Sequence, residues 1–97
     1  MAKIEDHINL LGLDVTDKIT GFTGIVTSVC FDLYGCIQAT IHPGLDKEGK
    51  IRDCHWFDIS RLRIDTIKPV MDRPDFTLLP LADGGKGPAD KPTFFKS

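Results

Sequence analysis

The feature that most constrains the fold is an alternation of apolar and polar residues between positions 13 and 67. Side chains of a β-strand point alternately to its two faces, so a period of two marks a strand with one buried face. The clearest case is the segment 36–42, in which Ile37, Ala39 and Ile41 share one parity and polar residues take the other. This pattern predicts a mostly β chain.

Alternating runs separated by turn residues predict five short strands. They lie at about 13–19, 24–31, 36–42, 51–58 and 62–67. Asp32 followed by Gly35 is typical of a tight hairpin turn, because Asp can bond its own backbone and Gly readily adopts a positive φ. Asp58 is a typical cap and predicts one helical turn before the last strand. The order of these elements is similar to that of small five-stranded barrels of the Src-homology-three type.

Parity also predicts which side chains are buried. The inward residues expected in the first two strands are Leu13, Val15 and Ile19, followed by Ile25, Val29 and Phe31. The three cysteines, at positions 30, 36 and 54, form an odd count without regular spacing. We therefore expect free thiols, two of them buried in strands, rather than a disulfide framework.

The two ends of the chain differ from its middle. Ile4, Ile8 and Leu11 are spaced by four and three, which predicts a short helix over about 3–11. Prolines and glycines punctuate the sequence beyond residue 70, where two apolar knots lie at 76–81 and 94–95. We expect a domain over residues 1–70 and an extended arm over 71–97. The knots could dock in a groove of this copy or a neighbouring one, or the arm could be disordered.

Charge and hydropathy narrow the classes of function. The formal net charge is −2, whereas dedicated nucleic-acid binders usually carry an excess of Lys and Arg. No apolar run approaches the roughly 18 residues of a membrane span, and the first residues lack the apolar segment of a signal peptide. We expect a cytoplasmic protein without a membrane partner.

Catalytic chemistry finds little support in the residue pattern. The possible metal ligands Cys36, His42, Cys54 and His55 are poorly spaced, because Cys36 and His42 lie about 20 Å apart along an extended strand. A chain with three histidines and fourteen carboxylates offers combinations of a nucleophile, a histidine base and a carboxylate by chance alone. We therefore expect no enzyme, no metal and no cofactor.

Exposed aromatic residues are better candidates for a binding surface. Tyr34 and Trp56 stand beside turns or in strands, where small barrels bind peptides or stack bases. The alternative is structural, with Trp56 covering one barrel end and Tyr34 shielding a hairpin. A local basic cluster accompanies Trp56 in the sequence and comprises Lys50, Arg52, Arg61 and Arg63. This cluster would carry any nucleic-acid binding.

One run also carries a family resemblance. The segment 15–27, which contains Thr20-Gly21-Phe22-Thr23-Gly24, together with Gly35-Cys36 and the segment 55–58, resembles a group of small phage and mobile-gene-element proteins. The resemblance spans about residues 13–67 and implies a genetic context. It transfers no catalytic residue, because no activity is established for that group.

The first functional hypothesis is a non-enzymatic interaction module that forms homo-oligomers through its arm. Its binding residues would be Tyr34, Trp56 and the apolar arm residues Phe76, Leu79, Phe94 and Phe95. Arms with buried anchors commonly join copies of a chain. The alternative is a nucleic-acid-binding barrel that uses the basic cluster and Trp56.

Overall fold

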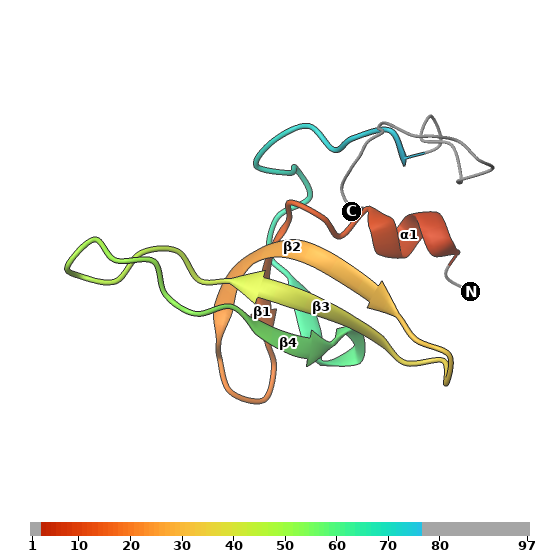
Figure 1. Ribbon diagram of the computed structural model, residues 1–97, viewed down its shortest axis with the longest axis horizontal. Coiled ribbons are helices and arrows are strands. Elements are labelled where there is room, and N and C mark those ends of the chain that lie inside the picture. Colours follow the sequence, from red (N-terminus) through yellow and green to blue (C-terminus); the bar gives the residue numbers. More distant parts are fainter. Residues whose placement is uncertain (1–2, 77–97) are drawn as a thin grey trace, which may run out of the picture.

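The computed structural model describes residues 3–76, and its main element is one antiparallel sheet with strand order β4-β3-β2-β1-β5 (Figure 1). The strands are β1 (Asp14–Asp17), β2 (Thr23–Phe31), β3 (Ile37–His42), β4 (His55–Asp58) and β5 (Leu62–Ile64). A short helix α1 (Ile4–Ile8) precedes them, and the 3-10 turn η1 (Ile59–Arg61) joins β4 to β5. The mostly β class with one short helix is therefore confirmed.

The sheet curls without closing. β2 bends strongly (Figure 1), and its register against β3 shifts between Val26 and Ser28. A bulge of this kind increases the twist of a strand and bends it. Along the sheet β4 pairs with β3, while β5 pairs with β1. Within residues 3–76 no ladder joins β4 to β5, so these two strands form the edges of the sheet.

The bulge also corrects the predicted burial in β2. Val26 is buried at 1% exposure and pairs with Ile41, whereas Ile25, expected inside, is only half-buried. Thr27 is the extra residue of the bulge. Because of it, Val26 rather than Ile25 faces the same side of the sheet as Val29. A strict period of two cannot anticipate this inserted residue.

The core is small and centred on the middle strands. Its buried residues are Leu13, Val15, Val26, Ala39 and Ile41. The predicted inward side of the third strand is confirmed, since Ala39 and Ile41 are fully buried and Ile37 is half-buried. The strands pack closely at Gly24, where an added Cβ would collide with the carbonyl of His42. This close approach explains the glycine in the middle of a strand pair.

Two large side chains expected inside are exposed. Ile19 is 74% exposed because β1 ends at Asp17 and the chain turns there. Phe31 is 45% exposed at the far end of β2, where its ring meets the edge of His7 from α1. The prediction of burial is wrong for both residues, because Ile19 lies beyond the end of β1 and Phe31 belongs to the last residue pair of β2 with β3, opposite Ile37.

The observed elements are shorter than the sequence pattern indicates. The fourth strand begins at His55, and residues 43–54 form a hairpin that projects from the sheet at the left of Figure 1. One bridge between Leu45 and Ile51 continues the pairing there. The helix spans only Ile4–Ile8, because the chain turns from residue 9 to 12. Strand pairing therefore ends before the alternation does.

Both predicted turns are confirmed. Asp32 Oδ1 accepts hydrogen bonds from the backbone N–H groups of Tyr34 and Cys36 at 2.9 Å, and Gly35 has a φ of 90°. Asp58 Oδ1 accepts from the Ser60 N–H at 2.9 Å and so caps η1. The physical reason is the same in both cases, because a short carboxylate satisfies backbone donors next to it.

The three cysteines correct another expectation. All are free, but all are exposed rather than buried. Cys30 pairs with Gln38 across the strands, on the face opposite the half-buried Val29 and the core residue Ala39. Among the described residues, no helix has the length and apolar character of a membrane span.

Candidate functional site

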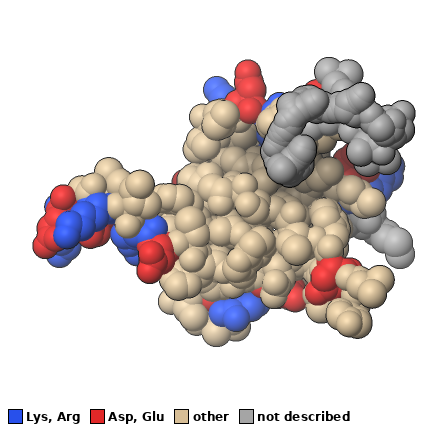
Figure 2. Space-filling model, in the orientation of Figure 1, with Lys and Arg blue, Asp and Glu red and all other residues tan. Residues whose placement is uncertain are grey.

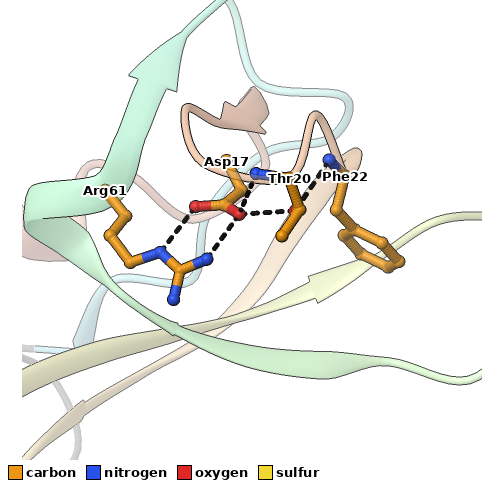
Figure 3. A network of polar contacts seen from close by, with 4 residues as sticks. All are labelled: Asp17, Thr20, Phe22 and Arg61. Carbon is orange, nitrogen blue, oxygen red and sulfur yellow. Dashed lines mark hydrogen bonds and ion pairs between the residues drawn. The ribbon is translucent and has the colours of Figure 1, made fainter.

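The one fully buried charge in residues 3–76 closes the corner between β1 and η1 (Figure 3). The two carboxylate oxygens of Asp17 accept hydrogen bonds from Nε and Nη2 of Arg61, both at 2.7 Å. The N–H and hydroxyl of Thr20 donate to Oδ2 at 2.9 and 2.5 Å. The carboxylate is thus held by four donors from two sides of the corner.

These contacts perturb both charges. The hydrogen bonds from Arg61 hold the pKa of Asp17 far below its usual value, although burial acts in the opposite direction. In turn, the hydrogen bond to Asp17 raises the pKa of Arg61. The guanidinium of Arg61 also lies 5.4 Å from the ring centre of Phe57. Because both oxygens of the carboxylate accept hydrogen bonds from within the fold, this corner is structural.

Ion pairs with carboxylates divide the predicted basic cluster of Lys50, Arg52, Arg61 and Arg63. Arg61 is held by Asp17, and Arg63 donates to Asp65 at 2.8 Å. Lys50 and Arg52 lie on the projecting hairpin, where Figure 2 shows basic and acidic side chains side by side. Two of the four predicted cations are therefore neutralised by carboxylates, and the other two stand among acidic neighbours.

The predicted aromatic residues lie apart from each other. Tyr34 is 88% exposed at the tip of the turn between β2 and β3. Trp56 is 54% exposed on β4, opposite Thr40. Its neighbour Phe57 alternates to the other face and packs on Phe22, with ring centres 5.2 Å apart. The structure therefore does not join Trp56 and Arg61 in one surface.

A surface with contributions from several segments lies where residues 70–76 pack beside β2 after the last strand. It is a hollow of about 300 Å³, which we call the apolar groove. Its main apolar lining residues are Leu11, Ile25, Val70, Met71, Pro74 and Phe76. The predicted arm residue Phe76 is thus part of one wall. Nearly all the side-chain surface inside the groove is apolar, as in most sites that bind side chains or small ligands.

Backbone hydrogen bonds fix the floor of the apolar groove. The N–H of Gly12 donates to the carbonyl of Val26 at 2.8 Å, and Gly12 in turn accepts from Val70 at 2.9 Å. Gly12 has a φ of 86°, and an added Cβ would lie 2.9 Å from Cβ of Pro69. A side chain is therefore excluded at the point where three segments meet.

The second wall is held by Arg73. Its Nε donates to the carbonyl of Leu11 at 2.8 Å, and its Nη2 donates to that of Asn9 at 2.6 Å. These carbonyls follow the end of α1, where a cation is also favoured by the helix dipole. Asp72 is the other charged residue that lines the groove. The wall is thus anchored to the fold while its apolar side chains stay open.

A second hollow, of about 380 Å³, lies across β2 and contains more polar groups. It is lined by Asp14, Thr23 and His42, among others. Nδ1 of His42 accepts from the N–H of Gly44 at 3.0 Å, so this nitrogen already has a partner. The hollow is wide and shallow, and the hydroxyls of Thr23 and Thr27 in its lining donate to the carbonyls of Val15 and Thr40.

Several functional expectations fall outside this geometry. Leu79, Phe94 and Phe95 lie beyond the described residues. Sequence reasoning missed Leu11, Ile25 and Val70 as groove residues. The available signal was the apolar pair at 70–71 directly after Pro69, which the alternation does not explain.

Within residues 3–76, no group of three or more His, Cys, Asp or Glu side chains is placed to hold a metal ion. Comparison of the chain with protein-family models, with curated proteins and with solved structures gives no match.

Proposed function

We propose that this chain is a non-enzymatic interaction module that associates with copies of itself through the segment that follows Phe76. The observation that carries the proposal is the apolar groove at the root of that segment. Its walls are built by Leu11, Ile25 and Phe76, and the last of these is the end of the described chain. Apolar surface gathered in one open hollow supports an interaction site at this place.

Exposed apolar side chains around the groove support the same function. Val70 is 65% exposed, Met71 is 71% exposed and Ile67 is 93% exposed. These three residues lie within positions 67–71 of the last described segment, and we call them the apolar border. Covering such a border with another protein removes its surface from water, which favours association.

The finer fold type and the context belong to this proposal. The strand order β4-β3-β2-β1-β5, with η1 between the two edge strands, supports a partly open barrel of the Src-homology-three type. The resemblance of segments 15–27 and 55–58 supports a role in a phage or another mobile gene element. Arg61 and Arg63 are both paired with carboxylates, so the charge arrangement favours a protein partner over nucleic acid.

Sedimentation equilibrium of the full chain and of a chain ending at Phe76 tests the proposal. Every buried core residue of the described range 3–76 lies between Leu13 and Ile41, and the Arg73 contacts are kept, so the shortened chain retains this core and the groove. We expect a multiple of the chain mass for the full chain and the monomer mass for the shortened one. A monomeric full chain, or equal association of both, would contradict the proposal.

A further inference from the structure

We propose that the apolar groove receives the aromatic pair Phe94–Phe95 of a second copy of this chain. The inference rests on the proposed function and names the segment and the surface that meet. Three properties carry it: the size and chemistry of the groove, the length of chain that follows Phe76, and the charges beside each partner.

The groove fits a small aromatic anchor. Its volume of about 300 Å³ lies at the lower end of cavities that bind ligands, which suits one or two side chains rather than a helix. The wall residues Val70 and Met71 are apolar, and aromatic side chains bury the largest apolar area per residue. Phe94 and Phe95 form the only adjacent pair of aromatic residues after Phe76.

The length of the chain allows this contact with a neighbour. Residues 77–93 connect the groove wall at Phe76 to the aromatic pair and contain several glycines and prolines. A chain of this length can span at most about 60 Å when fully extended, enough to reach a groove on an adjoining copy. Leu78 and Leu79 are poorer occupants, because they follow Phe76 within about 10 Å of chain and continue from the wall itself.

The charges are complementary. Asp72 lines the groove as an acidic residue, while the guanidinium of Arg73 is engaged by the carbonyls of Leu11 and Asn9. In the sequence, Lys91 and Lys96 flank the aromatic pair. The approach of these lysines to Asp72 is electrostatically favourable.

The exposed border favours a second copy over the chain's own groove. Val70 and Met71 remain largely exposed beside the groove, and Ile67 lies outside its lining at 93% exposure. A two-residue anchor from the same chain fills the groove and leaves Ile67 in water. A neighbouring copy could cover this border with its own folded domain. Exchange of identical segments between copies is also a common route to dimers.

Four full-length variants test the inference by sedimentation equilibrium. The double change Phe94→Ser and Phe95→Ser removes the anchor, and Val70→Asp places a charge in the groove. The matched controls are Leu78→Ser with Leu79→Ser, in the same arm, and Leu33→Asp, at a side chain that is 92% exposed elsewhere. We expect the first two to weaken association at least roughly thirtyfold and the controls to leave it unchanged.

Mixing the two defective proteins gives the sharper result. The Val70→Asp protein keeps its anchor, and the Phe94→Ser, Phe95→Ser protein keeps its groove. Together they should form a heterodimer with one anchor in one groove, although neither associates alone. Met71→Asp, at another exposed wall residue, provides a second groove variant and should behave as Val70→Asp does.

The outcomes separate this inference from the proposed function. If truncation after Phe76 abolishes association but the loss of both phenylalanines does not, the function stands and the anchor is wrong. The anchor is also wrong if Leu78 and Leu79 are required instead. If the full chain is monomeric, with the anchor in its own groove or in none, both proposals fail. Lack of complementation between the two variants overturns the exchange between copies.

Discussion

Two places where distant parts of the chain meet, the corner at Asp17 and the apolar groove at Gly12, are built in opposite ways. At the corner of Asp17, a buried carboxylate is surrounded by donors from Arg61 and Thr20. At the apolar groove, backbone hydrogen bonds hold Gly12 to Val70, but the side chains above them stay uncovered. The first place is satisfied within the described chain, and the second leaves apolar surface in water.

This difference separates stability from interaction. A buried charge must be paired, because an unpaired one in a dry environment is costly. An apolar hollow can stay open at a smaller cost and gains free energy when a partner fills it. The corner should therefore control folding, while the groove should control association.

The largest effect is expected for Asp17→Asn. The amide cannot accept from Arg61 and Thr20 as the carboxylate does, and it leaves the guanidinium without its counter-charge. Thermal unfolding should show a Tm lower by about 10 °C or more. The matched control is Arg63→Gln, which breaks the exposed pair with Asp65 and should shift the Tm far less. Equal shifts for the two variants would remove the distinction between corner and surface.

The second effect concerns acid. Because the pKa of Asp17 is lowered in the folded state, the folded chain binds fewer protons than the unfolded one, and the stabilisation is full above the unfolded value of about 3.8. It is lost as the pH falls from there toward the folded pKa. Urea unfolding between pH 5 and pH 2, about the range of such a loss, should show a steep decline for the native protein. Asp17→Asn should flatten it, leaving only the slope from groups such as Asp58, whose pKa is also lowered.

The smallest effect on global stability is expected for Arg73→Ala. The change removes two hydrogen bonds to the carbonyls of Leu11 and Asn9, at the edge of the fold. It should lower the free energy of unfolding by about 1 kcal/mol. Hydrogen exchange should accelerate at the N–H of Val70 but not at that of Val26. Uniform acceleration across the sheet would show that the groove wall belongs to the core and not to a separate surface.

The sequence predicted the sheet through its clearest signals. The parity of Ile37, Ala39 and Ile41 and the short carboxylates Asp32 and Asp58 act locally, so they were interpreted correctly without tertiary information. The strand ends were not predictable in this way, because they depend on where a neighbouring strand stops covering the chain.

The Asp17 corner and the apolar groove could not be predicted from the sequence, for different reasons. The ion pair joins residues 44 positions apart, and no local pattern marks Asp17 among fourteen carboxylates. The groove combines Leu11, Ile25 and Val70 from three segments, and strict alternation predicts Ile25 to be buried because it does not reveal the bulge at Thr27. Phe76 was selected as an apolar arm residue, but its position in the groove wall required the return of the chain over Gly12.

The most direct test of the central claim is isotope-filtered NMR on an equimolar mixture of labelled and unlabelled full-length protein. The account predicts contacts between the ring protons of Phe94 or Phe95 in one copy and the methyl groups of Ile25 or Val70 in the other. Ring contacts confined to a single copy, or intermolecular contacts that bypass the groove, would contradict it.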